Sequence, residues 1–165
     1  MRIGLISDTH SFLDERVFTY FEECDEIWHA GDIGDLSVTD RLAAFKPLRA
    51  VYGNIDDHLA RRTYPETIDF ELEGVRVVMT HIGGKPYAYS NNIKDYLVKN
   101  PPKLFICGHS HICRVEMDKK LGMIYMNPGA AGNHGFHQQK TLLRFSLNQG
   151  RIEQLEVVEL GKRGG

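Results

Sequence analysis

The sequence predicts an α/β fold built from two facing mixed sheets, with helices on the outer side of each sheet. Two observations support this fold class. The first half of the chain alternates short apolar runs with amphipathic segments, a pattern typical of parallel strands joined by helices. The second half consists mainly of apolar runs separated by turn residues, a pattern typical of hairpins. Two sheets packed face to face would bury the apolar residues of both halves.

The first half is expected to form three strands and two helices. Each predicted strand is a short apolar run that ends at a polar residue or at glycine. The first predicted helix carries Val17, Phe18 and Phe21 at helical spacing. In chain order, these elements are Arg2–Ser7, the helix Phe12–Glu23, Glu26–His29, the helix Leu36–Phe45 and Leu48–Tyr52.

The second half is expected to form three hairpins, one further strand and one helix. The turn sequences Glu73-Gly74 and Asn148-Gln149-Gly150 separate paired apolar runs, and Asn100-Pro101-Pro102 ends the helix. The predicted hairpins are Thr67–Leu72 with Val75–Thr80, Cys113–Met117 with Met123–Met126, and Lys140–Leu147 with Arg151–Val158; the further strand is Lys103–Cys107 and the helix Ser90–Lys99.

The composition fits one soluble globular domain over residues 1–165. Apolar residues make up 42% of the chain, and 20 Lys and Arg residues face 22 Asp and Glu residues. Without net positive charge, we expect no nucleic-acid partner beyond a nucleotide-type substrate. Three cysteines without metal-type spacing predict free thiols in a reducing compartment, and no apolar run reaches the ~18 residues of a membrane helix. We therefore expect a cytoplasmic protein without a membrane partner, and self-association to a homo-oligomer stays open.

Polar residues follow the ends of five predicted strands. The carboxyl ends of strands in an α/β sheet form one edge, which is where ligands bind. We therefore expect these side chains to lie near one another. They are Asp8 and His10 after the first strand, Asp32 after the second, Asn54 after the third, His81 after the first hairpin, and His109 and His111 after the strand Lys103–Cys107.

This set of side chains suits divalent metal ions. Imidazole, carboxylate and amide oxygen are ligands for ions such as Mn, Fe, Co or Zn, and no cysteine joins the set. Seven ligands exceed the needs of one ion, whereas two ions that share a carboxylate would use them and would clamp a phosphoryl group. Each residue alone has a structural explanation, because Asp8 could cap a helix and Asn54 could form a turn. The ordered set favours the metal site.

Five short motifs occur in the same order as the motif blocks of the calcineurin-like metallophosphoesterases and resemble them. The small size of the chain is similar to that of the YfcE-type phosphodiesterases in this family. The resemblance implies one metallophosphoesterase domain with a four-layer α/β/β/α sandwich. It also implies hydrolysis of a small phosphoester substrate by a hydroxide that bridges two divalent ions. Mn is the expected metal, with Ni, Co, Fe and Zn as alternatives. The motifs are Asp8-Thr9-His10, Gly31-Asp32, Gly53-Asn54, His81 and Gly108-His109-Ser110-His111.

The same resemblance assigns roles to the individual residues. It places Asp8, His10 and His111 on the first ion and Asn54, His81 and His109 on the second, with Asp32 bridging both. It also implies that Asp32, Asn54 and His81 are catalytic residues, and that Asn54 contacts the substrate.

Two departures from the family pattern bear on the substrate. Many members have a histidine after the asparagine of the third motif, where it protonates the leaving group, but this chain has Ile55. Since isoleucine cannot donate a proton, substrates with good leaving groups are favoured over those with poor ones. We also expect phosphodiesters to be preferred over phosphomonoesters. YfcE-type members usually read His-Gly-His at the fourth motif, whereas this chain reads His81-Ile82-Gly83-Gly84. Gly83 is expected to let the backbone approach a phosphate, or else to form a plain turn.

Other residues are candidates for substrate or supporting contacts. Asn127, in Asn127-Pro128-Gly129, resembles a segment of YfcE-type proteins and is predicted to contact substrate or a ligand histidine, or to end a strand. His134 and the nearby His137 are expected to supply a proton or to contact phosphate, or else to lie on the surface. His29 is expected to support the ligands from behind, and Asp56 is expected either to do the same or to form a turn.

Three other functions remain open from the sequence. One is a non-catalytic metal-binding scaffold of the same fold, as in the eukaryotic retromer subunit that resembles this family. A scaffold would not need to keep all seven ligand positions, and this chain keeps them. The other two are a phosphomonoesterase and a nuclease, and the nuclease is disfavoured by the absence of net positive charge.

Overall fold

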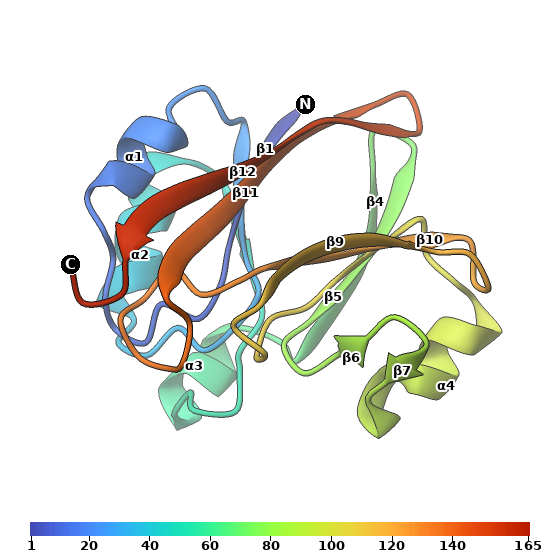
Figure 1. The fold of residues 1–165 in the computed structure, drawn as a ribbon, viewed down its shortest axis with the longest axis horizontal. Helices are drawn as coiled ribbons and strands as arrows, with labels where there is room; N and C mark the ends of the chain where they lie inside the picture. The colour runs from blue at the N-terminus through green and yellow to red at the C-terminus, as the bar shows by residue number, and fades with distance from the viewer.

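The computed structural model describes all 165 residues, which form two five-stranded mixed sheets, a short hairpin and four helices (Figure 1). The first sheet has the order β12-β11-β1-β2-β3, with β1 (Arg2–Ile6), β2 (Glu26–His29), β3 (Leu48–Ala50), β11 (Gln139–Asn148) and β12 (Arg151–Lys162). The second sheet has the order β4-β5-β8-β10-β9, with β4 (Thr67–Leu72), β5 (Val75–Thr80), β8 (Leu104–Ile106), β9 (Cys113–Asp118) and β10 (Met123–Pro128). The hairpin is β6 (Gly84–Lys85) with β7 (Ala88–Tyr89), and the helices are α1 (Arg16–Tyr20), α2 (Ser37–Phe45), α3 (His58–Thr63) and α4 (Asn91–Lys99).

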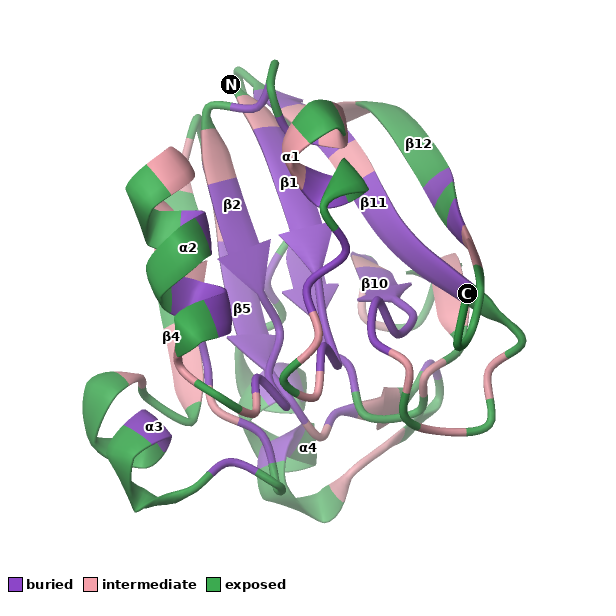
Figure 2. Ribbon diagram, turned by 90° about the vertical axis from the view of Figure 1, so that its left-hand side faces the viewer, coloured by how far each residue is buried: buried purple, intermediate pink, exposed green.

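Three apolar clusters hold these elements in four layers. Between the sheets, Trp28 of β2 packs with residues of both sheets, including Val77 and Ile106. Helices α1 and α2 cover the outer face of the first sheet, where Val17 and Leu42 are fully buried (Figure 2). Helix α4 covers the outer face of the second sheet in a third cluster. The predicted α/β/β/α sandwich is therefore confirmed.

Parallel pairing brings the carboxyl ends of the central strands to one edge. In the first sheet, β1 pairs in parallel with β2, and β2 with β3. In the second sheet, β5 and β10 both pair in parallel with β8. The remaining strands pair antiparallel, so both sheets are mixed. The loops that follow β1, β2, β3, β5 and β8 consequently emerge side by side, and these loops carry the predicted ligands.

The helix α1 is shorter than the predicted Phe12–Glu23. The backbone N–H of Phe12 instead donates to the carbonyl of Thr9 in a turn, and the N–H of Arg16 donates to the carboxylate of Asp14, so the helix begins only at Arg16. The sequence prediction also missed α3, the hairpin of β6 and β7, and the last four residues of β12. None of the four helices is long and apolar enough to cross a membrane.

Candidate metal centre

The predicted ligand residues lie together in two groups at the edge formed by the strand ends. The ligand atoms within each group all lie within 4.8 Å of one another. The first group is Asp8, His10 and His111, and the second is Asp32, His81 and His109. The two groups match the two ion sites that the sequence resemblance implies, except that Asn54 is not among these acidic and histidine residues.

The side chain of Asn54 joins the second group from the loop after β3. Its Oδ1 lies 3.0 Å from Nδ1 of His109, although the two residues are 55 positions apart in the chain. Both side chains are exposed at the rim, whereas His81 below them is buried. A ligand that binds there is therefore open to solvent on the side of Asn54 and His109.

The two carboxylates connect the groups. Asp8 Oδ1 lies 3.1 Å from Nε2 of His111 in its own group and 3.8 Å from Nε2 of His81 in the other. Asp32 Oδ2 lies 3.2 Å from Nε2 of His81 and 3.4 Å from Nε2 of His10. Both carboxylates thus face histidines of both groups, which is the arrangement needed for a shared ligand.

Several buried polar atoms of the two ligand groups have no hydrogen-bond partner. Asp8 Oδ1, His10 Nε2 and His81 Nε2 are all buried and unpartnered. A buried polar atom without a partner costs on the order of 1–3 kcal/mol, so native proteins rarely retain one without a reason. The Nδ1–H of His81 donates to the carbonyl of Ala30 at 2.7 Å, so Nε2 is the ring nitrogen that faces the two carboxylates. These residues fit bound cations: one in the first group would satisfy Asp8 and His10, and one in the second would satisfy His81.

The electrostatics of the centre also favour cations. Burial opposes the charge of Asp8, but contacts with His10 and His111 outweigh it and hold the pKa of Asp8 well below its usual range. Burial likewise opposes the charge of Asp32, and the neighbouring His81 ring lowers the pKa of Asp32. Burial disfavours protonation of His81, yet contacts with Asp32 and Asp8 raise the pKa of His81 above its ordinary value. Both carboxylates therefore stay ionised at neutral pH.

Most of the ligand residues adopt an unusual backbone conformation. A left-handed φ angle costs an ordinary L-residue roughly 1–2 kcal/mol, so it persists only where the surroundings hold it. Here the loops bond to one another: the backbone N–H of Asp8 donates to the carbonyl of Gly31 at 3.0 Å. The residues with positive φ are Asp8 (53°), His10 (45°), Asp32 (54°), His109 (70°) and His111 (61°). The strain is thus concentrated on the ligands themselves.

Comparison with known proteins agrees with this geometry. Residues 1–150 match the calcineurin-like phosphoesterase superfamily domain. The chain belongs to that superfamily. A probable metallophosphoesterase of Methanothermobacter thermautotrophicus is 31% identical over 135 residues, which cover 79% of this chain and 77% of the relative.

Solved structures of the superfamily share the fold. An archaeal phosphodiesterase has a TM-score of 0.78 at 19% identity and covers 97% of this chain and 100% of its own. Vps29 of Entamoeba histolytica, solved with Zn²⁺, has a TM-score of 0.73 at 17% identity and covers 96% of this chain and 99% of its own. At these identities the likeness concerns the fold alone. The chain is a calcineurin-like phosphoesterase with candidate metal ligands in two groups.

Asp56 ties together two ligand loops of this phosphoesterase. Its carboxylate accepts hydrogen bonds from the backbone N–H groups of Ile33 at 3.1 Å, Gly34 at 2.8 Å and Gly53 at 2.7 Å. Gly53 itself must be glycine, because a Cβ at this position would overlap the carboxylate of Asp32. Asp56 is therefore a positioning residue for the loops that carry the second group.

His29 supports the first loop from behind. The backbone N–H of Gly31 donates to Nδ1 of His29 at 3.1 Å, and Nε2 lies 3.0 Å from the hydroxyl of Thr9. Complete burial lowers the pKa of His29 to about 4, so the ring is neutral. His29 thus fixes the loops of β1 and β2 relative to each other without adding charge.

The predicted substrate residues lie in different surroundings. Asn127 is fully buried and donates to the carbonyl of Gly108 at 2.9 Å, so it holds the loop that carries His109. Gly83 is buried where a Cβ would approach Cys107 to 2.7 Å. His134 is exposed, and its ring lies 4.8 Å from that of His10 between centroids.

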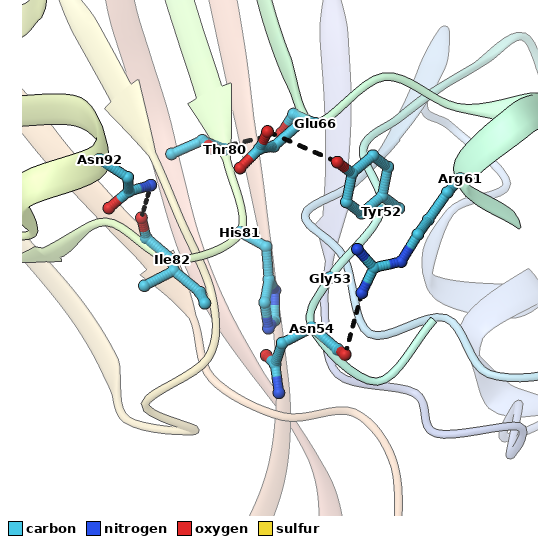
Figure 3. Close-up of a pocket in the computed structure, with 9 residues that line it drawn as sticks. All are labelled: Tyr52, Gly53, Asn54, Arg61, Glu66, Thr80, His81, Ile82 and Asn92. Carbon is cyan, nitrogen blue, oxygen red and sulfur yellow. Dashed lines mark hydrogen bonds between the residues drawn. The ribbon is translucent and has the colours of Figure 1, made fainter. Parts of the chain in front are cut away.

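A small cavity beside the second group includes residues that the sequence reasoning missed. The cavity is about 160 Å³ and is lined by the ligands Asn54 and His81 together with Arg61 and Glu66 (Figure 3). Arg61 belongs to α3, which was not predicted, so nothing placed its side chain near the centre. Asp57, which caps α3 by accepting from the backbone N–H of Ala60 at 3.0 Å, is the signal that could have revealed this helix.

Proposed function

We propose that the protein is a metal-dependent phosphodiesterase that uses two divalent ions, with Mn²⁺ as the favoured metal and Ni, Co, Fe or Zn as alternatives. One observation carries the proposal: each of two adjacent ligand groups contains a carboxylate that also faces a histidine of the other group, and three of these ligand atoms are buried without a partner. Imidazole, carboxylate and amide donors suit these divalent metals. A reducing compartment is the expected location, because all three cysteines are free.

In this proposal each residue has a defined task. Asp8, His10 and His111 hold one ion, Asn54, His81 and His109 hold the other, and Asp32 contacts both. When bound, two such ions would supply a hydroxide nucleophile at neutral pH and would neutralise charge on the phosphoryl oxygens.

The remaining residues of the centre keep the ligands in place. The carbonyl of Ala30 fixes the tautomer of His81, and the backbone N–H of Ile55 donates to Oδ1 of Asp32 at 3.1 Å. That bond leaves Oδ2 of Asp32 free to face His81 and His10. Preorganised ligands of this kind need no rearrangement when substrate arrives.

The side chain at position 55 supports a preference for substrates with good leaving groups. Ile55 is 45% exposed beside the ligand Asn54, and it has no proton to donate. General acid catalysis typically contributes ~10²–10⁴-fold to the rate, so its absence at this position weighs most on substrates with poor leaving groups. A phosphomonoesterase is the alternative outcome of the test below.

A non-catalytic scaffold receives less support. A scaffold gains nothing from ligands in strained conformations or from unpartnered buried atoms, yet this chain has both. The fold that it shares with Vps29 is compatible with either role.

The test is to remove metal, add back single ions and compare two substrates. Bis-p-nitrophenyl phosphate is a diester and p-nitrophenyl phosphate is a monoester, and both release the same coloured product. We expect activity to return with Mn²⁺ and to favour the diester. Failure of every metal to restore hydrolysis of either ester would overturn the proposal, while preference for the monoester would assign a phosphomonoesterase.

A further inference from the structure

The cavity beside the second group of ligands opens directly onto the candidate metal centre. Two of its lining residues, Asn54 and His81, are ligands of that centre, and the cavity extends from them toward Tyr52 and Glu66 (Figure 3). A phosphodiester carries two organic groups next to its phosphorus atom. If phosphorus lies at the metal centre, one of these groups reaches a space of about 160 Å³.

Arg61 presents one free edge of its guanidinium group to this space. Its Nε donates to the carbonyl of Asp56 at 2.8 Å, and its Nη2 donates to the carbonyl of Asn54 at 3.2 Å. The guanidinium carbon lies 4.8 Å from the centre of the Tyr52 ring. These contacts fix the group, and its remaining nitrogen, Nη1, makes no hydrogen bond within the protein, while Arg61 lines the cavity (Figure 3).

The opposite side of the cavity offers hydrogen-bond acceptors. Glu66 receives one hydrogen bond from the hydroxyl of Tyr52 at 3.4 Å, and its carboxylate has further acceptor capacity. Nδ2 of Asn92 is engaged with the carbonyl of Ile82 at 2.9 Å, and its Oδ1 points away from the other lining residues (Figure 3). The ligand of this cavity must therefore bring a hydrogen-bond donor for Glu66 and an acceptor for Arg61.

The charges at the cavity exclude other classes of ligand. A cationic group would face Arg61 and the bound metal ions, and an anionic group would face Glu66. An apolar group would strip water from charged side chains without replacing their hydrogen bonds, which is unfavourable. A neutral group with neighbouring hydroxyls meets all the requirements, because a hydroxyl donates and accepts.

We propose that this cavity is the subsite for one ester group of the substrate, and that it binds a neutral hydroxylated group of the glyceryl or ribosyl type through Glu66 and Arg61. The inference rests on the proposed phosphodiesterase function. It deepens that function, since it identifies the chemical class of one organic group that the centre accepts.

The test compares two diesters that release the same p-nitrophenol. One carries a glyceryl group and the other a propyl group, so they differ only in the two hydroxyls. We expect kcat/KM to favour the glyceryl ester by at least about tenfold, the effect of one hydrogen bond to a charged group. The variant Glu66→Ala should bring this ratio close to one. Glu71→Ala, which removes an exposed glutamate of β4 outside the cavity, serves as the matched control and should keep the ratio.

A second readout does not depend on turnover. Calorimetry of the Mn²⁺-loaded protein with glycerol phosphate and with propyl phosphate measures the same preference as a ratio of Kd values. We expect a similar ratio for the wild type and its loss in Glu66→Ala. Equal Kd values, or no binding of either compound, would overturn the subsite. If neither diester is hydrolysed with any metal, the proposed function fails, and the calorimetric ratio still decides the subsite.

Discussion

At the scale of single residues, Asp32 faces histidines of both ligand groups. One carboxylate oxygen accepts from the backbone of Ile55, and the other faces His81 and His10. Asp32→Asn removes the negative charge and keeps the shape of the side chain. We expect metal-restored diester hydrolysis to fall by more than about a hundredfold, because the group that would contact both ions loses its charge.

The fold of this variant should stay intact, as measured by circular dichroism and thermal unfolding, because buried Asp32 lies outside the apolar clusters and asparagine keeps its shape. Asp95→Asn is the matched control, since Asp95 is exposed on α4, and it should retain full activity. Full activity of Asp32→Asn would refute the assignment of Asp32 to both ions.

Ile55 tests the missing proton donor. Ile55→His introduces a group that can protonate a leaving group, so hydrolysis of phenyl esters should rise by at least about tenfold relative to p-nitrophenyl esters. Leu59→His adds the same side chain at a position on α3 that is 53% exposed and outside the cavity, and it should leave the ratio unchanged. An unchanged ratio in Ile55→His would show that the missing proton donor at this position does not limit hydrolysis of esters with poor leaving groups.

The positions of the individual candidate metal ligands could be predicted best from the sequence. The residues placed after predicted strands did gather at one edge, since parallel pairing dictates where strand ends lie. Arg61 and Glu66 could not be placed in the same way, because one lies on an unpredicted helix and the other in a loop. Their contribution depends on tertiary contacts that no local pattern records.

At the scale of elements, Asp56 couples the loop after β2 to the loop after β3. Asp56→Ala would leave three backbone N–H groups without their acceptor. We expect the free energy of unfolding to fall by at least about 2 kcal/mol. Since the same loops carry Asp32 and Asn54, the Kd for Mn²⁺ should rise by roughly 10–100-fold, the usual effect of losing a residue that orients metal ligands.

Denaturant unfolding and calorimetric metal titration check these two effects together. The neighbouring Asp57→Ala is the control, because Asp57 accepts only from Ala60 and its loss should cost about 1 kcal/mol of stability. Metal affinity should fall far less in this control than in Asp56→Ala. Equal metal affinity in the two variants would contradict the positioning role of Asp56.

A buried ion pair joins β11 to the loop before α1. Nζ of Lys140 is fully buried and lies 3.2 Å from Oδ2 of Asp14, and it also donates to the carbonyl of Gly165 at 2.9 Å. Bonds from Arg16, opposed in part by burial and aided by Lys140, hold the pKa of Asp14 well below its usual range. Asp14→Asn should therefore lower the free energy of unfolding by about 3 kcal/mol at pH 7, because a buried lysine loses its partner.

The sign of the pH dependence follows from the lowered pKa. The unfolded chain takes up a proton at Asp14 near pH ~3.9, before the folded protein does, so the stabilisation is fully present above that value. It is lost as the pH falls below the unfolded pKa toward the folded one. The difference between wild type and Asp14→Asn should thus be constant from pH 7 to 5 and shrink in denaturant titrations below pH 4. A constant difference down to pH 2 would contradict the pair.

The element boundaries show why local patterns were incomplete. The apolar spacing at Val17 and Phe21 predicts a helix from Phe12 onward, but Phe12 bonds back to Thr9 in a turn and Asp14 accepts from the N–H of Arg16, where the helix begins. Turn residues and apolar runs therefore predicted that the elements exist, whereas these hydrogen bonds decided where α1 begins.

At the scale of the whole molecule, the fold class could be predicted because each apolar face of a sheet or helix must be buried against another element. The face of Trp28 meets the face of Val77 between the sheets, and the other faces meet helices. The arrangement of ligands in two groups with shared carboxylates then follows from which strands are parallel. What the pattern could not supply was the shape of the cavity beside the ligands, which depends on α3 and on the loop that carries Glu66.

The central claim is that one molecule holds two metal ions in the two groups of ligands. Crystals grown with Mn²⁺ and measured at its absorption edge locate each ion by anomalous scattering. We expect two peaks about 3.5–4 Å apart, one beside Asp8 and His111, the other beside Asn54 and His81, with Asp32 between them. A single peak in the centre, or none, would contradict the account.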